Sequence, residues 1–359
     1  MARSVLSRPG LRRLGLELAT AASAAMGAGL AAALGLPAAW LLGAMIATAA
    51  AALAGLPVGL NRAAREIAFL LLGISIGSGV TPEILGQVQA WPGSIALLVA
   101  SIAATMAVSS GYLTRVHGWD RTTARFASMP GAFSSVAVLA ANSSADLPRV
   151  ILAQSLRVFT LVALMPPVLS MASGTPPAGP AGRSAQSVNS PAEALAVFLA
   201  GGAVAVLLNR LRVPAGTLLG VMVVSAGLHA AGLVHGRFPQ PLIILGFIAT
   251  GAVIGARFRG TTLRTVIRTV PGASVSILLA LGVSALFAVA GAWMLALPFG
   301  QLWLAYAPGG VEAMAAMALV LKLEPAFVGT HHVLRILGLN LVGPLWLRAP
   351  RRAGKGRGT

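Results

Sequence analysis

The sequence predicts an all-α polytopic integral membrane protein made of two inverted repeats, each with about five spans and one Pro-Gly-interrupted segment. Hydrophobic residues make up 57% of the 359 residues, and charged residues make up 9%. Apolar runs of about 20 residues, the length that crosses a bilayer as a helix, recur from end to end. Pro-Gly pairs interrupt two of these runs, where the broken backbone needs protein or water partners because lipid offers none.

The order of the segments predicts four parts of the chain. The first half has apolar segments at about 14–35, 37–55, 66–80, 91–114, 128–143 and 147–171, and the second half at about 192–209, 214–235, 240–256, 271–297, 300–321 and 326–347. We therefore expect an N-terminal membrane repeat over 1–172, a flexible linker rich in Pro, Gly and Ser over 173–191, a C-terminal membrane repeat over 192–348 and a basic tail over 349–359. The basic N-terminus resembles a signal peptide. The apolar sequence continues through Pro37, so we expect a retained first span.

The two halves match at a nearly constant offset. Gly73 matches Gly251, and Arg157 matches Arg335, each pair being 178 residues apart. The Pro-Gly pairs match at the same offset, because their prolines stand at positions 130 and 308. A constant offset over such a length indicates an internal duplication.

The basic residues predict how the halves are oriented. A net charge of +18 would suggest nucleic acid in a soluble domain, but here the 26 Lys and Arg lie mostly between apolar runs, where they signal topology. If all twelve segments spanned the membrane, 16 basic residues would lie inside and 8 outside. If the Pro-Gly segments enter and leave on one side, 21 lie inside and 3 outside, with Arg157 and Arg335 in the membrane. This second arrangement has five spans per half, and an odd number inverts the second half.

Each Pro-Gly break is a candidate binding site, because a half-helix that starts there points free N–H groups and a positive dipole end into the protein. The candidate residues are Pro130, Gly131, Ser134 and Ser135 in the first copy and Pro308, Gly309, Gly310 and Glu312 in the second. Glu312 is either a proton carrier or a partner of its own helix terminus.

Arg157 and Arg335 lie about ten residues into apolar segments, where an Arg costs at least ~2.5–3.5 kcal/mol. Gln154 shares a helix face with Arg157, as His331 and His332 do with Arg335. On one hypothesis, the two arginines face the breaks and bind a carboxylate or similar anion. On the other, each Arg caps the carbonyls of a broken helix or pairs with the glutamate of the second break.

Metal and covalent chemistry find little support in the sequence. The chain has no cysteine and five histidines, which excludes disulfides, Fe–S clusters and Cys-based zinc sites. His331 and His332 are adjacent, so on a helix they point about 100° apart and do not easily share an ion. No catalytic triad or phosphate loop is present. We expect no metal, no cofactor and no enzymatic activity.

Five motifs resemble those of the duplicated bacterial AbrB membrane protein family: GISIG at 73–77, MPGAFSSV at 129–136, AQSLR at 153–157, PGGVEAM at 308–314 and GTHHVLR at 329–335. The resemblance covers nearly the whole chain except the linker and the tails. Members of this family have been labelled ammonia monooxygenases and regulators of aidB expression. The family is also grouped with cation/proton antiporter and anion transporter folds, which implies the inverted arrangement. It shares its name with a soluble DNA-binding regulator, which this sequence does not resemble.

Three functions are open at this point. The expected one is secondary transport of a small organic or weak-acid anion, with proton coupling through Glu312 or a histidine as an added possibility. The alternative is a membrane-embedded regulator that acts indirectly on gene expression, and the least expected is a monooxygenase, which lacks visible ligands. We expect a multi-pass protein of the bacterial cytoplasmic (inner) membrane with both termini cytoplasmic. The expected partners are the lipid bilayer and a small anionic substrate, without direct binding of nucleic acid; a homo-oligomer is left open.

Overall fold

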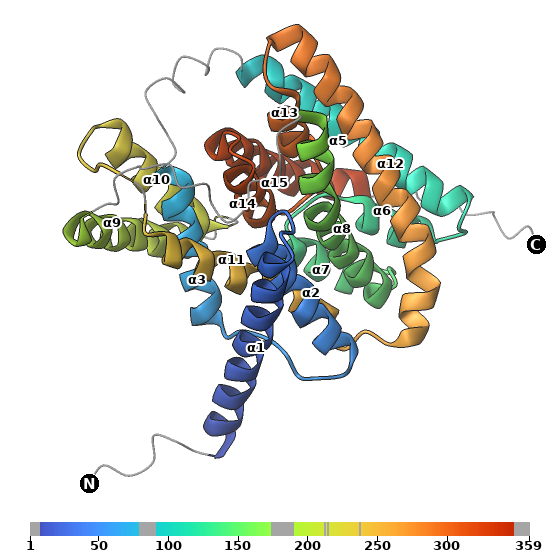
Figure 1. The fold of residues 1–359 in the computed structure, drawn as a ribbon. Helices are drawn as coiled ribbons and strands as arrows, with labels where there is room; N and C mark the ends of the chain where they lie inside the picture. The colour runs from blue at the N-terminus through green and yellow to red at the C-terminus, as the bar shows by residue number, and fades with distance from the viewer. Residues whose placement is uncertain are drawn as a thin grey trace, which may run out of the picture.

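The computed structural model describes residues 8–78, 91–173, 190–211, 213, 215–236 and 238–347, and its regular structure in these ranges is helical (Figure 1). Among them, six helices are long and apolar enough to cross a membrane: Gly15–Ala33, Trp91–Arg115, Leu147–Met171, Pro191–Arg210, Gln240–Phe258 and Arg264–Leu295. The chain is therefore an all-α polytopic membrane protein, as the sequence predicts. Most of the predicted linker and the basic tail lie outside the described residues.

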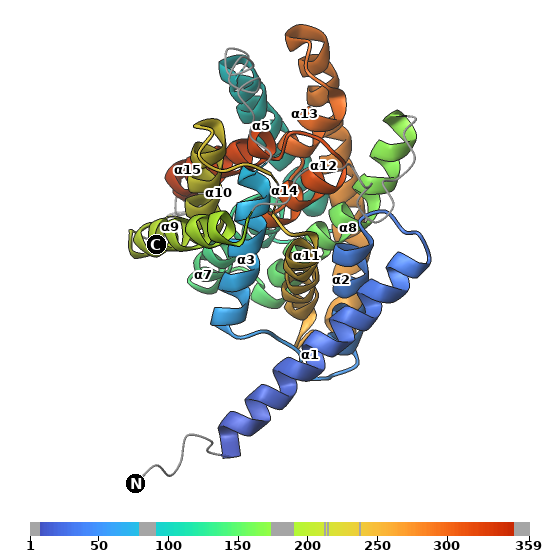
Figure 2. The same ribbon diagram turned by 60° about the vertical axis from the view of Figure 1, so that its left-hand side comes forward.

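The helices of the first half follow the predicted segments closely. They are α1 (Arg8–Ala33), α2 (Ala39–Leu53), α3 (Arg62–Gly77), α5 (Trp91–Arg115), α6 (Arg121–Ser128), α7 (Phe133–Ala141) and α8 (Leu147–Ser173). The predicted segment at 128–143 is interrupted, because α6 ends before it and α7 begins inside it. Figure 2 shows α1 along the outside of the bundle, next to α2.

The second half repeats this order. Its elements are α9 (Pro191–Arg210), α10 (Gly216–Ala230), α11 (Gln240–Gly255), a short 3-10 helix η2 (Ala256–Phe258), α12 (Leu263–Leu295), α13 (Phe299–Tyr306), α14 (Val311–Val320) and α15 (Pro325–Leu347). Four of them begin 178 residues after their counterparts: α11 after α3 (240 − 62), α13 after α6 (299 − 121), α14 after α7 (311 − 133) and α15 after α8 (325 − 147). The offset seen in the sequence therefore also relates the helix starts.

Glycines join the two halves at two helix crossings. α3 of the first half packs on α10 of the second, and a Cβ on Gly77 would lie 2.5 Å from the carbonyl oxygen of Met222. In the equivalent crossing of α11 on α2, a Cβ on Gly255 would lie 2.6 Å from the carbonyl oxygen of Met45. Only glycine permits such close backbones, so the prediction that these glycines serve helix packing is confirmed.

Helices α5 and α12 occupy equivalent places in the two halves and lie side by side in opposite directions (Figure 1). Near the start of α5, a Cβ on Gly93 would lie 3.0 Å from Leu295 at the end of α12. Beyond the end of α5, the His117 ring would lie 2.9 Å from a Cβ on Gly272, in the first part of α12. Equivalent helices that run antiparallel are what inverted repeats require.

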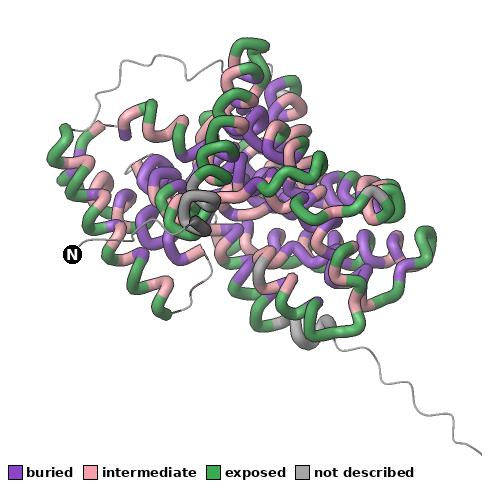
Figure 3. The backbone as a smooth tube through the Cα atoms, turned by 90° about the horizontal axis from the view of Figure 1, so that it is seen from below, coloured by how far each residue is buried: buried purple, intermediate pink, exposed green. Residues whose placement is uncertain are grey.

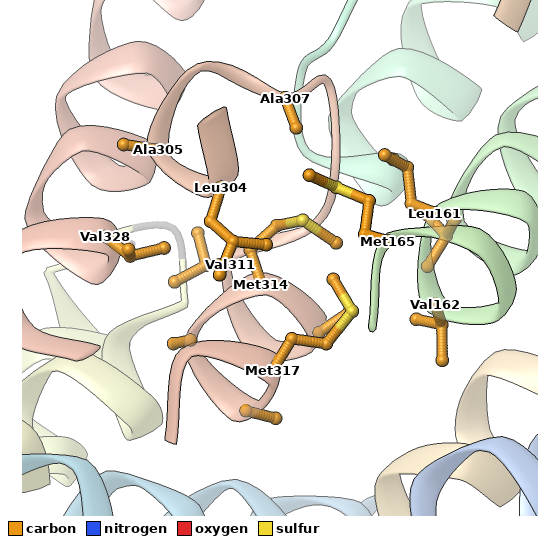
Figure 4. Close-up of a cluster of buried hydrophobic side chains, with 14 of the residues drawn as sticks. Leu161, Val162, Met165, Leu304, Ala305, Ala307, Val311, Met314, Met317 and Val328 are labelled. Atoms are coloured by element: carbon orange, nitrogen blue, oxygen red, sulfur yellow. The ribbon is translucent and has the colours of Figure 1, made fainter. Parts of the chain in front are cut away.

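The interrupted segments lie inside the protein. The broken helix α14 packs its Val311, Met314 and Met317 against α8, α13 and α15 (Figure 4). Figure 3 shows the same division in the whole molecule, with buried backbone in the interior and exposed backbone outside. On the outer helices the exposed side chains are often large and apolar, such as Leu18 on α1 and Leu199 on α9. The bundle therefore offers lipid an apolar surface and keeps its broken helices among protein partners.

Candidate functional site

The two predicted breaks are present, and each separates a pair of short helices. The first break (129–132) lies between α6 and α7, and the second break (307–310) lies between α13 and α14. Each contains a proline, which lacks the N–H of a helical hydrogen bond and disfavours helix in the residue before it. The half-helices α7 and α14 therefore begin inside the bundle, each with free backbone N–H groups at its start.

At the first break, side chains from α8 bind the carbonyl groups that the interruption exposes. Gln154 Nε2 donates to the carbonyl oxygens of Phe126 at 2.7 Å and Met129 at 2.9 Å. Arg157 Nη1 donates to Met129 O at 3.3 Å and Ala127 O at 3.4 Å, and Arg157 Nη2 donates to Gln154 Oε1 at 2.5 Å. These donors replace the helical partners that the C-terminal end of α6 lacks.

At the second break, α15 supplies the same kind of donors. Arg335 Nη1 donates to Ala307 O at 2.7 Å, and Nη2 donates to Gly309 O. His332, which stands 178 residues after Gln154, bonds through Nε2 to Leu304 O at 2.9 Å. Both arginines thus cap broken-helix carbonyls, which is the structural hypothesis formed from the sequence.

His331 points away from the break and belongs to a different buried cluster. Its Nε2 lies 2.9 Å from Ser94 Oγ on α5, and its Nδ1 bonds Phe327 O at 2.9 Å. Ser94 Oγ also lies 2.9 Å from the Tyr306 hydroxyl, at the end of α13. The two adjacent histidines therefore have separate partners, and no three His, Asp or Glu side chains of the described residues gather as a metal site needs.

A cavity of about 710 Å³, here called the central cavity, lies where α7 and α14 begin. Of the predicted site residues, the cavity is lined by Gly131, Ser135, Gln154, Arg157, Gly309, Gly310 and Glu312. The other predicted residues do not line it: Pro130, Pro308, His331, His332 and Arg335 are buried in the surrounding protein, and the side chain of Ser134 lies outside the described residues.

The charged lining of the central cavity is mostly positive. Besides Arg157, it includes Arg65 of α3, Arg257 of η2 and Arg259, against the two carboxylates Glu66 and Glu312. The sequence analysis placed these three other arginines among the cytoplasmic loop charges. No local signal distinguishes them, because a basic residue at the end of an apolar segment is also what topology requires.

Arg157 is the most enclosed charge of this lining. Its side chain comes from the middle of α8, and the residue is only 5% exposed. Its Nε has no hydrogen-bond partner in the described part of the chain, although its terminal nitrogens are bonded. A buried N–H without a partner next to a cavity is a donor available to a ligand.

Arg257 lies between the two half-helices. Its guanidinium carbon is 4.7 Å from the ring centre of Phe133, the first residue of α7. It also interacts electrostatically with Glu312, in the first turn of α14, and with Arg65. The contact with the ring fixes Arg257 at one half-helix while its charge acts on the other.

The two carboxylates of the cavity have different surroundings. Glu66 accepts a hydrogen bond from the Thr217 hydroxyl and lies 3.8 Å from the Nε of Arg62. Glu312 makes no hydrogen bond and no ion pair within 4.0 Å with any described residue. Glu312 is therefore a half-buried carboxylate whose nearby positive charge does not contact it directly.

The fold and the site together define a class of protein: an integral membrane protein with two discontinuous helices whose starts meet at a central cavity. A comparison with protein families then identifies the family. The model described as "Transition state regulatory protein AbrB" matches residues 9–77 and 40–350, so the chain belongs to the AbrB family.

Two relatives extend this result. A protein of Escherichia coli (strain K12) named "Putative regulator AbrB" is 29% identical over 335 residues, which cover 89% of this chain and 93% of that protein. A protein of Bacillus subtilis (strain 168) named "Uncharacterized protein YhjN" is 26% identical over 306 residues, covering 80% of this chain and 79% of that protein. The resemblance inferred from the motifs is thus confirmed over most of the chain.

Proposed function

We propose that the protein is a secondary transporter of a small organic or weak-acid anion. The observation that carries the proposal is the central cavity of about 710 Å³, which both half-helix starts and four arginines line. Helix starts favour negative charge through their free N–H groups and dipole, and Arg157 adds a buried N–H without a partner. Discontinuous helices that point their ends at one shared site are typical of secondary transporters. The cavity has the size of a small-molecule site.

The orientation of the chain in the membrane belongs to the same proposal. The antiparallel packing of α5 and α12 supports two inverted membrane repeats, over 1–172 and 192–348. We propose that the protein lies in the cytoplasmic membrane with both termini in the cytoplasm, since this orientation follows the positive-inside rule. The protein would then have the lipid bilayer and a small anion as partners and would perform no covalent chemistry.

A transport measurement with the purified protein tests the proposal. Proteoliposomes are exposed to gradients of acetate, benzoate, succinate and inorganic phosphate and, in a separate arm, of tetraethylammonium. We expect electrical or pH signals with at least one anion, and a loss of about tenfold in Arg257→Gln because one positive charge leaves the cavity. The matched control is Arg264→Gln, an exposed arginine on α12 that does not line the cavity. Movement of tetraethylammonium without movement of any anion would contradict the proposal.

The name of the Escherichia coli relative keeps a second candidate in view. If this protein regulates genes, we propose that it does so from the membrane and indirectly, as a consequence of transport. Transcripts are compared between a deletion strain and a strain carrying Arg257→Gln on the chromosome. Matching transcript changes support regulation through transport, whereas wild-type transcripts in a transport-deficient Arg257→Gln strain would show that regulation is independent of it.

A further inference from the structure

We propose that Glu312 is the proton-binding group of the central cavity, and that it competes with the transported anion for Arg257, so that each anion enters with a proton. This inference rests on the proposed transport of anions and adds the coupling to it. It also assigns Arg257 as the cation for which the two carboxylates, that of the protein and that of the substrate, compete.

The position of Glu312 shows why it competes with a substrate. Glu312 is the second residue of α14, and its Oε2 lies 3.2 Å from where a Cβ on Gly310 would stand. The carboxylate is therefore folded back over the start of its own half-helix, which is where free N–H groups would attract an anion. Without a substrate, the protein keeps a negative charge of its own at this place.

The charged groups around Glu312 leave it as the carboxylate able to titrate. The cavity presents Arg65 and Glu66 from α3, Arg157 from α8, and Arg257 and Arg259 from the segment after α11. Arginines stay protonated over the physiological range. Glu66 is already held by a hydroxyl and by an arginine of its own helix.

The other helices packed against α14 add no competing charge to the cavity. The sequences of α11 and α13 contain no charged residue. On α15, His332 and Arg335 are bonded to the carbonyls of α13 and the second break, His331 is bonded to Ser94, and none of the three lines the cavity. A change in the charge of the central cavity between pH 5 and pH 8 is therefore assigned to Glu312.

The coupling conserves charge and protons. When the carboxylate of Glu312 takes up one proton, the cavity loses one negative charge, and the charge of Arg257 becomes free for one monovalent anion. The anion and the proton together add no net charge to the site. When the anion leaves, Glu312 releases the proton and again faces Arg257.

Two thiol reagents of opposite charge test the inference without knowledge of the natural substrate. The chain has no cysteine, so Ser135→Cys, which lines the cavity on α7, gives one thiol of nearly the same size as the serine. The reagents are the anionic sulfonatoethyl and the cationic trimethylammonioethyl methanethiosulfonates. Both react with the thiolate, so the ratio of their rates cancels the ionisation of the thiol and reports the charge of the cavity.

We expect the anionic reagent to be favoured relative to free cysteine in solution, and the ratio to rise about tenfold from pH 8 to pH 5. Glu312→Gln in this background removes the titrating carboxylate, so the ratio should be high and independent of pH. Glu312→Ala serves the same purpose if the glutamine variant does not fold. Glu66→Gln removes the other carboxylate of the cavity and should leave the rise with pH in place.

The outcomes separate the coupling from the proposed function. An anion preference that does not change with pH, or a pH dependence that persists in Glu312→Gln, would overturn the coupling and leave the anion site intact. No preference for the anionic reagent at either pH would instead overturn the anion site, and with it the basis of the proposed transport.

Discussion

At the scale of single residues, the two intramembrane arginines hold broken helices together, and their surroundings differ. At the first break, Arg157 shares its carbonyl partners with Gln154, which bonds Met129 O independently. At the second break, His332 bonds a different carbonyl, so Arg335 is the side chain that binds Gly309 O. Arg157 therefore has a nitrogen to offer the cavity, whereas Arg335 serves the backbone.

This difference predicts unequal costs for replacing the two arginines. Arg335→Met leaves a buried carbonyl without its side-chain donor, and we expect a loss of about 2–3 kcal/mol in the free energy of unfolding. Arg157→Met should cost about 1 kcal/mol, because Gln154 continues to bind the first break. Unfolding of both purified variants in detergent measures the difference. An equal or larger loss for Arg157→Met would show that Gln154 does not support the break alone.

At the scale of helices, the halves are joined by equivalent crossings in which α3 meets α10 and α11 meets α2. At both crossings glycines let one helix backbone approach the other, which places the starts of α10 and α11 near the half-helices. The segment after α11 then carries Arg257 to the cavity, at the start of α7. The crossings thus help to position a residue of the second half beside a half-helix of the first.

A single methyl group should weaken such a crossing. In Gly255→Ala the added Cβ would meet the carbonyl oxygen of Met45 at 2.6 Å, and we expect a loss of about 1–3 kcal/mol. Gly282→Ala on α12 is the matched control, because no atom lies within 4 Å of the added Cβ. The control should keep or slightly raise stability through its better helix propensity. Thermal unfolding of the two variants compares them, and equal stabilities would refute the packing role of Gly255.

At the scale of the whole molecule, the antiparallel helices α5 and α12 place two connections at the same end of the bundle. The end of α5 lies beside the first part of α12, so the loops at 115–125 and 257–268 lie close together. This arrangement agrees with the orientation that the basic residues predict, in which both loops face the cytoplasm.

Cysteine labelling tests this orientation, and the absence of native cysteine makes it clean. The variants are Arg121→Cys and Arg264→Cys, both exposed, and Leu233→Cys, exposed in the connection after α10. In sealed right-side-out vesicles, a membrane-impermeant maleimide should label Leu233→Cys and should reach the other two only after the membrane is opened. Labelling of Arg121→Cys and Arg264→Cys from opposite sides would contradict the inverted arrangement.

Much of the fold was predictable from the sequence because it rests on local patterns. The length of apolar runs gave segments such as 91–114 and 147–171, which agree closely with α5 (Trp91–Arg115) and α8 (Leu147–Ser173). The Pro-Gly pairs marked both breaks, because proline lacks the N–H that a continuous helix needs. The break residues and Gln154 were likewise found at the cavity, since a broken helix in a membrane protein must lie against polar groups.

The sequence by itself determined that this chain crosses a membrane as helices, that it is duplicated, and where each half is interrupted. Tertiary structure alone decided which charges share the cavity. It brought Arg65 and Arg257 to the half-helix starts, and it directed Arg335, His331 and His332 to backbone and hydroxyl partners instead. The physical reason is that hydrophobicity and helix breaking act along a few turns of chain, whereas a guanidinium finds its partner on whichever helix the packing places beside it.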